Sequence, residues 1–451
     1  MTLWEKGGAV DARVAAFTVG DDYLWDRELV IFDCAGSVAH ASALTRAGLL
    51  REEEFVALRD ELRLIPAQFR EGRFEVLPEH EDVHTAVELH LSEVLGEPGR
   101  KLHAGRSRND QVLTDLRLAA KWRLAGVASA LGKMMESLTG FARAARRVPM
   151  PGYSHMRRAM PSTVGLWAAA FAESLGDDFV LLEAVYRLLD RSPLGSAAGF
   201  GSRLSLDRSH TARLLGFRRV QANTLAVQNS RGKLELAVLE ALGQIGLDLN
   251  RLASDLCLFS MPEFGFFELP EEITTGSSLM PQKRNPDVLE LVRGRAHALR
   301  SYASRTGGLV HDLPSGYNRD CQLTKAPFLA GMRECAECLD IMTVVIENLS
   351  VNEDRCREAL SPELYATDRA LSLVRKGAAF RDAYRMVADE LREGRLPAGP
   401  DSRKRPTAPS EGELSDLFRE AARVADWGAR ERRVSVRMLR GLLGKEAPLP
   451  D

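Results

Sequence analysis

Residues 113–148 read LTDLRLAAKWRLAGVASALGKMMESLTGFARAARRV, and apolar side chains recur in this stretch at steps of three and four. The series includes Leu113, Leu116 and Val148, and it contains no proline before the PMPG at 149–152. This spacing places the apolar side chains on one face of a single helix of about 35 residues, which is about 50 Å long. Because so long an apolar face needs several helical neighbours, the sequence predicts an all-α fold built as a long-helix bundle.

A second helical series supports this prediction. It runs from Leu234 to Leu256 with the same steps of three and four. Helices this long exceed the core of one ordinary domain, so we expect some of their apolar faces to be buried between subunits.

The helical pattern divides the chain into three expected parts. Residues 1–105 form an N-terminal helical domain, 106–350 a central long-helix bundle domain, and 351–451 a small C-terminal helical domain. The last part is interrupted by a connector rich in proline and glycine, at 394–409.

Charge and composition exclude several function classes. The chain has 61 Lys and Arg against 63 Asp and Glu, a net charge of −2, which gives no reason to expect a nucleic-acid partner. No apolar run approaches the roughly 18 residues that a membrane span needs. The N-terminal MTLWEKGGAVDARV lacks the apolar core of a secretory signal. Six cysteines in so long a chain indicate no disulfide framework, so we expect a cytoplasmic protein.

Three patterns that resemble cofactor or metal sites have simpler explanations. Cys335 and Cys338 form CxxC on one face of an expected helix, but no second Cys or His pair lies nearby at zinc-ribbon spacing. HEDVH at 80–84 matches HExxH, but Asp82 lies inside it and the flanks are not those of a zincin helix. The glycine-rich 195–202 lacks a preceding strand and a P-loop lysine. We therefore expect no cofactor and no metal.

Four polar segments interrupt the helical pattern or border it. They are AGRSRNDQV (104–112), PGYSHMRRAMP (151–161), TTGSSLMPQKRNP (274–286) and GYNRDCQLTK (316–325). Helix capping explains part of their composition. Ser107 and Asp110 suit a capping box before the long helix, and Asn285 suits an N-cap followed by Pro286.

Capping leaves much of segment 274–286 unexplained, because Gly276, Ser277, Ser278 and Lys283 lie outside the expected helix. A helix N-terminus offers free N–H groups and a positive potential, so the loop before it suits a carboxylate or a phosphate. Lys283 adds a full positive charge to this loop. The residues alone leave capping and anion binding open.

Together the four segments resemble those of the argininosuccinate lyase branch of the fumarase/aspartase superfamily. TGSSLMPQKRNP is similar to the superfamily signature GSSxMPxKxNP, and AGRSRNDQV and YNRDCQLTK are similar to segments of the argininosuccinate branch. EDVHTAVE (81–88) matches as well, so the resemblance covers most of 80–325. It implies a homotetramer whose central helices form a twenty-helix core, with each active site shared by three subunits.

The resemblance also implies a reaction. Argininosuccinate, a small-molecule partner, undergoes reversible elimination to L-arginine and fumarate in arginine biosynthesis, through an aci-carboxylate carbanion. That intermediate carries two negative charges, so a cationic loop with hydrogen-bond donors holds it more tightly than it holds the substrate. Lys283 and Asn285 suit this task. By the resemblance Ser277 is the catalytic serine, and it acts as the base if its neighbours stabilise the alkoxide. A role as hydrogen-bond donor alone is the alternative.

The guanidino leaving group must depart protonated, which requires a second proton-transfer residue. By the resemblance this is His155, with Glu290 as the carboxylate that orients the imidazole and raises its proton affinity. Within the family, removal of the carbon proton has been assigned both to the serine and to the histidine. We favour Ser277 as the base and His155 as the acid. The substrate-binding residues that the resemblance implies are Asn109, Ser154, Asn285, Tyr317, Gln322, Lys325, Arg106, Arg108 and His84. For the arginines, ordinary surface ion pairs are the alternative.

The sequence departs from the family pattern in places. Ser154 stands where threonine is usual, and Arg157 and Met160 stand where glutamine is commoner. Many members have a serine in the N-terminal segment that touches the arginine end, whereas FTVGDDYLWD (17–26) offers Thr18 but no serine. This departure concerns the specificity for the amine part of the substrate and not the elimination chemistry. It supports a second hypothesis, a carbon–nitrogen lyase that releases fumarate from a different N-succinyl amine.

A third hypothesis is a catalytically silent structural protein, because lens crystallins derive from this family. The joint presence of Ser277, Lys283, His155 and Glu290 argues against it, since a protein without catalysis does not need all four.

Overall fold

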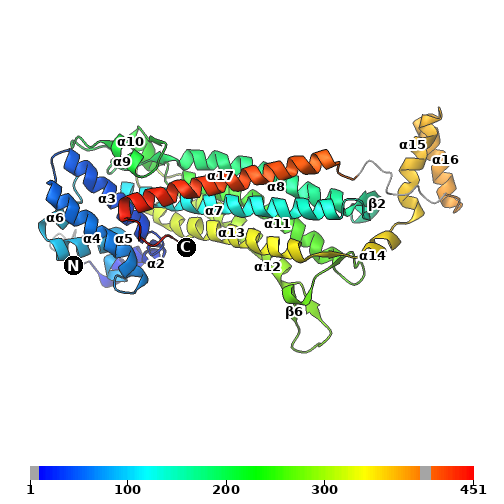
Figure 1. Ribbon diagram of the computed structural model, residues 1–451, viewed down its shortest axis with the longest axis horizontal. Coiled ribbons are helices and arrows are strands. Elements are labelled where there is room, and N and C mark those ends of the chain that lie inside the picture. Colours follow the sequence, from blue (N-terminus) through cyan, green and yellow to red (C-terminus); the bar gives the residue numbers. More distant parts are fainter. Residues whose placement is uncertain (1–9, 397–407, 451) are drawn as a thin grey trace.

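The computed structural model of the protein describes residues 10–396 and 408–450. A bundle of long helices forms its body, with short helices packed at one end and a helical pair beyond the other end (Figure 1). Most of the expected connector and the first nine residues of the N-terminal segment lie outside the described residues. The division of the chain into three parts stays a prediction.

Six long helices make up the bundle. They are α7 (Arg108–Ala144), α8 (Val164–Leu189), α11 (Lys233–Phe259), α12 (Asp287–Val310), α13 (Lys325–Asn348) and α17 (Glu411–Leu443). The predicted single long helix is confirmed as α7, which has 37 residues. Its expected capping box is present, with Ser107 as N-cap and Asp110 closing the first turn. Leu113, Leu116 and their successors along the stripe are buried in the core.

Helix α7 lies against α8, α13 and α17, and α17 runs along it over most of its length (Figure 1). Two glycines allow this close approach. A Cβ added at Gly428 of α17 would lie 2.5 Å from Ser129 Oγ, and one at Gly132 of α7 would lie 2.6 Å from the Ala425 nitrogen. The contact between α7 and α17 therefore depends on small residues.

Shorter elements surround the bundle. Before α7 come α1 (Ala12–Val19), α2 (Asp22–Asp26), α3 (Val30–Arg46), α4 (Glu52–Arg70), the 3₁₀ helix η1 (Pro78–His80), α5 (Val83–Leu95) and α6 (Glu97–Lys101). Between the long helices lie α9 (Arg208–Leu214), α10 (Thr224–Asn229), η2 (Glu271–Ile273) and η3 (Arg319–Thr324), and after α13 come α14 (Glu353–Glu358), η4 (Pro362–Tyr365), α15 (Ala366–Arg375) and α16 (Phe380–Arg392). None of the helices described is both long enough and apolar enough to cross a membrane.

The strands form four two-stranded sheets within the described residues. The longest pair is the antiparallel hairpin of β1 (Pro149–Ser154) and β2 (Arg157–Thr163). The others are β3 (Arg191–Ser192) with β4 (Arg219–Val220), β5 (Phe267–Glu268) with β8 (Ser350–Val351), and β6 (Thr275–Gly276) with β7 (Arg284–Asn285).

The expectation that Asn285 caps the helix after it is wrong. Helix α12 begins at Asp287 with Pro286 at the N-cap position, and Asn285 belongs to β7, where it pairs with Thr275. The physical reason is that the first helical N–H groups, of Leu289 and Glu290, donate to the Pro286 carbonyl, while the Asn285 side chain donates to the Gly276 carbonyl. Asn285 therefore closes the base of a loop rather than the start of a helix.

Candidate active site

Six of the predicted binding residues meet at one cavity, which lies at the N-terminal end of α7 and has a volume of about 110 Å³. They come from α5, from α7, from η3 with the residues just before it, and from the start of α13. These residues are His84, Arg108, Asn109, Tyr317, Gln322 and Lys325. Segments that are far apart in the sequence thus form a single charged pocket, as the resemblance implies.

Lys325 is held between two carboxylates at this cavity. Its side chain is 2% exposed, and its Nζ donates to Asp22 Oδ2 at 2.7 Å and also to Asp26. Burial alone lowers the pKa of Lys325, but the two carboxylates outweigh it, and the pKa is raised. Lys325 is therefore a charged group whose charge is already neutralised by the protein.

The two predicted arginines lie in different surroundings. Arg108 Nη1 donates to Asp82 Oδ2 at 2.6 Å, with Glu81 Oε2 at 3.4 Å, at the edge of the cavity. Arg106 is buried, and its Nη1 donates to Ser37 Oγ at 2.9 Å. An ordinary surface ion pair is therefore the wrong explanation for Arg106.

His84 faces the cavity from a buried position. Its Nδ1 lies 2.7 Å from Asp33 Oδ1 and 3.6 Å from Asp115 Oδ2, whereas its Nε2 has no hydrogen-bond partner among the described residues. The 2.7 Å separation is a hydrogen-bond distance, so a proton links this pair. The literal HExxH motif does not form a zincin helix, because His80 lies in η1 and Asp82 caps α5 between the two histidines.

The stability of the protein should fall as the pH rises from about 6.5 to about 9 because of His84. Burial lowers the pKa of His84, but Asp33, Asp82 and Asp115 outweigh it and raise the pKa from 6.5 to about 9. A raised histidine pKa stabilises the fold fully below 6.5, and this contribution is lost as the pH rises through 9. The loss is on the order of 3 kcal/mol. Guanidinium unfolding midpoints at several pH values measure it.

The control for this prediction is His84→Gln, which removes the titrating group. Its unfolding midpoint should be lower at neutral pH and should depend much less on pH between 6.5 and 9 than that of the unchanged protein. Parallel pH profiles for the two proteins would show that His84 does not carry this dependence.

Ser154 and His155 lie at the opposite end of the bundle, at the turn of the β1–β2 hairpin (Figure 1). His155 and Met156 have positive φ angles, 53° and 59°, which L residues adopt mainly in tight hairpin turns. Both Ser154 and His155 are exposed. The turn thus presents the imidazole on the surface of the protomer, away from the cavity at the start of α7.

The loop of Ser277 and Lys283 projects from the side of the bundle between β6 and β7 (Figure 1). Ser277 Oγ accepts hydrogen bonds from the backbone N–H groups of Leu279, at 3.3 Å, and Met280, at 3.1 Å. Lys283 is exposed, and Asn285 Nδ2 donates to the Gly276 carbonyl at 3.4 Å. The loop therefore holds its serine oxygen against two donors.

Glu290 lies in the first turn of α12, and its Oε1 is 3.6 Å from Arg293 Nη2. The expected pair of Glu290 with His155 is not formed within the protomer. Apart from Arg106, the predicted residues thus occupy three separate places: the cavity at the start of α7, the β1–β2 turn, and the β6–β7 loop with the start of α12. Because α7 spans about 55 Å between the cavity at its start and the β1–β2 hairpin after its end, one protomer cannot bring all three places together.

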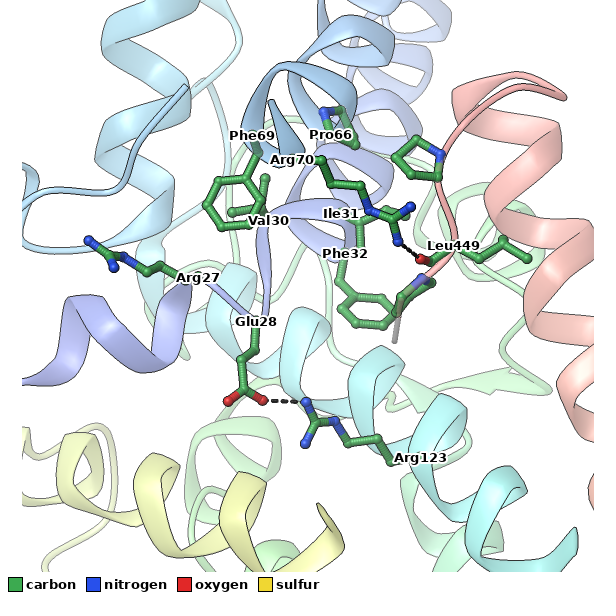
Figure 2. Close-up of a pocket in the computed structure, with 12 residues that line it drawn as sticks. Arg27, Glu28, Val30, Ile31, Phe32, Pro66, Phe69, Arg70, Arg123 and Leu449 are labelled. Atoms are coloured by element: carbon green, nitrogen blue, oxygen red, sulfur yellow. Dashed lines mark hydrogen bonds and ion pairs between the residues drawn. The ribbon is translucent and has the colours of Figure 1, made fainter. Parts of the chain in front are cut away.

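A second cavity, of about 310 Å³, lies under the C-terminal residues 448–450 (Figure 2). Glu28 forms an ion pair with Arg123 on one side of it, and Arg70 donates to the Leu449 carbonyl on the other. None of the predicted site residues lines this cavity. It is therefore a place where the C-terminal segment closes on α3 and α4, and not part of the candidate site.

Comparison with known proteins identifies the family. A family model described as lyase matches residues 5–300. The argininosuccinate lyase of Thermotoga neapolitana is 45% identical over 388 residues, which are 86% of this chain and 98% of that protein. The argininosuccinate lyase of Xylella fastidiosa is 43% identical over 426 residues, which are 94% of this chain and 95% of that protein. The chain belongs to the argininosuccinate lyase family.

Solved structures with a similar fold identify the architecture of this argininosuccinate lyase family member. An EDDS lyase variant with bound fumarate is 23% identical, with a TM-score of 0.78, and the match covers 97% of this chain and 95% of that one. A class II fumarase from Schistosoma mansoni is 17% identical, with a TM-score of 0.70, and the match covers 93% of this chain and 96% of that one. The predicted fumarase/aspartase-like helical bundle is thereby confirmed.

Several charged residues at the cavity of this argininosuccinate lyase family member were not predicted. They are Asp22, Asp26, Glu81, Asp82, Arg231 and Arg319. Asp22 and Asp26 stand four residues apart, which puts them on one face of a helix, and that spacing was a usable signal in FTVGDDYLWD. Arg231 is buried, with its Nε 3.4 Å from Glu235 Oε1. No local pattern around it indicates a site.

Proposed function

We propose that the protein is an argininosuccinate lyase, which converts argininosuccinate to L-arginine and fumarate in arginine biosynthesis. The observation that carries the proposal is 45% identity to an argininosuccinate lyase over 98% of that protein's length. The charged cavity at the start of α7 agrees with it, because the substrate carries carboxylates, an ammonium and a guanidinium. Such a ligand needs both signs of charge at its site.

We assign Ser277 as the base that removes the carbon proton. An ordinary serine hydroxyl is too weak a base, so the assignment requires stabilisation of the alkoxide. The N–H groups of Leu279 and Met280, which donate to Ser277 Oγ, supply such stabilisation. Lys283 and Asn285 on the same loop would hold the doubly charged aci-carboxylate as it forms.

His155 is the proposed acid that protonates the leaving guanidino group, with Glu290 as its orienting carboxylate. The positive φ angles of His155 and Met156 hold the imidazole out from the hairpin, which suits a residue that acts on a substrate bound to another subunit. Glu290 is exposed and has only Arg293 as a distant partner among the described residues, so it can accept such a pairing.

We propose a homotetramer whose active sites each combine residues of three subunits. The separation of the cavity, the hairpin turn and the β6–β7 loop along one protomer supports it. Val180 of α8, Leu247 of α11 and Leu291 of α12 are each more than half exposed, and apolar side chains on a helical bundle favour burial against another protein surface. Five helices from each protomer, α7, α8, α11, α12 and α13, would give the twenty-helix core.

The purified protein should release fumarate rapidly from argininosuccinate, as followed by ultraviolet absorbance. The matched control is the Ser277→Ala variant in the same assay, which should release almost none. Release from another N-succinyl amine but not from argininosuccinate would favour the second hypothesis, a lyase for a different amine. A folded protein that acts on none of these compounds would instead support the catalytically silent structural protein.

A further inference from the structure

Asp22, the first residue of α2, lines the cavity at the start of α7. Its carboxylate is 14% exposed, and only its Oδ2 accepts from Lys325 Nζ, at 2.7 Å. Asp26, which is fully buried, accepts from the same ammonium. Two carboxylates thus face one lysine, so this corner of the cavity carries one more negative than positive charge.

The other cations at the cavity already have protein partners. Arg108 bonds Asp82, Arg231 lies beside Glu235, and Arg319 Nη2 donates to the Thr18 carbonyl at 2.9 Å. Arg108 and Arg231 are thus matched by carboxylates, whereas Arg319 donates to a neutral carbonyl and keeps its charge. The charge of Arg231 lowers the pKa of Asp22, but burial and Asp26 outweigh it. Within the described residues, 10–396 and 408–450, Asp22 Oδ1 has no hydrogen-bond partner. Of the two carboxylates that bind Lys325, that of Asp22 is the more exposed.

Burial and the neighbouring Asp26 raise the pKa of Asp22, although Lys325 and, more weakly, Arg231 oppose them. A carboxylate in this position gains more from a second cation than one that is fully solvated or singly paired. The same cavity also presents the Tyr317 hydroxyl and the Arg319 guanidinium, which suit a carboxylate. The corner thus combines groups for a cation and for an anion, as a zwitterionic amino acid requires.

We propose that Asp22 binds the α-ammonium group of the arginine half of the substrate and thereby selects an amino acid as the amine. The proposal rests on the proposed function, and it answers the question that the missing serine in 17–26 raised about this end of the substrate. The alternative is that Asp22 acts only by holding Lys325 in place. The two roles differ in whether the effect of Asp22 depends on the α-ammonium of the amine.

The test runs the reaction in reverse, with fumarate and either L-arginine or 5-guanidinopentanoate, which is arginine without its α-amino group. The unchanged enzyme should use arginine with a kcat/KM higher by roughly 30-fold or more, as expected for a hydrogen bond between charged groups. Asp22→Asn should raise the KM for arginine by about the same factor, with a small change in kcat. Its kcat/KM for 5-guanidinopentanoate should stay nearly constant.

Asp21→Asn is the matched control, because Asp21 is exposed and its side chain caps no helix. It should behave like the unchanged enzyme with both amines. An Asp22→Asn variant that loses the same factor with both amines would overturn the proposal in favour of a structural role through Lys325. If that variant does not fold, the comparison of the two amines with the unchanged enzyme still tests the proposal, because equal use of the two amines would overturn it. An unchanged enzyme that joins neither amine to fumarate would overturn the proposed function as well.

Discussion

Ser277→Ala should lower kcat for argininosuccinate cleavage by about a thousandfold or more, because removal of a general base costs roughly 10²–10⁴ in rate. The Michaelis constant should change little, since the lost hydroxyl acts on the proton in the transition state rather than on the bound substrate. Assembly should be unaffected, because Ser277 bonds only backbone groups of its own loop. Fumarate release gives both constants, and size-exclusion chromatography gives the assembly.

The size of the loss separates the two roles considered for Ser277. A hydroxyl that only donates a hydrogen bond to a charged intermediate is worth about 10- to 100-fold, which is well below the loss expected for the base. Thr274→Ala is the matched control, because it removes a hydroxyl from the same segment, one that donates only to the Glu271 carbonyl. It should keep most of the activity. A Ser277→Ala variant within tenfold of the unchanged enzyme would refute any catalytic role.

The helical architecture was predictable because its signals are local. The apolar steps from Leu113 onward and the Ser107–Asp110 capping box lie within single segments, and both appear in the structure. Asn285 was misjudged for a reason that is also local. A good N-cap residue was recognised, but Asn285 pairs with nearby Thr275 in the β6–β7 hairpin, and the first helical hydrogen bonds go to the Pro286 carbonyl instead.

The candidate site was predictable only in part. The polar segments at 104–112 and 316–325 were expected at one site by resemblance, and the structure places Asn109 and Lys325 at one cavity. The partners of Lys325 were missed because Asp22 lies 303 residues away in the chain, and no periodicity connects them. The separation of Ser277 and His155 from that cavity is likewise set by the length of the bundle and not by any motif.

Two inactive variants should restore activity when they are assembled together. Ser277→Ala and His155→Asn should each be nearly inactive alone as homotetramers. In the proposed tetramer the β6–β7 loop and the β1–β2 turn of one site come from different subunits, so a mixed assembly contains some sites with both residues intact. Random mixing in equal amounts gives such sites a frequency of roughly one quarter.

The measurement is fumarate release after the two variants are dissociated in mild denaturant, mixed and returned to buffer. Activity should rise from near zero to about a quarter of that of the unchanged protein treated in the same way. The decisive control pairs Ser277→Ala with Lys283→Met. Both changes fall on the β6–β7 loop, so no subunit in that mixture supplies an intact loop, and activity should stay near zero. A site contained within one protomer would give no recovery in either mixture, because no chain in them carries every catalytic residue. Recovery in the first mixture alone therefore requires that the loop and the hairpin turn of one site come from different subunits.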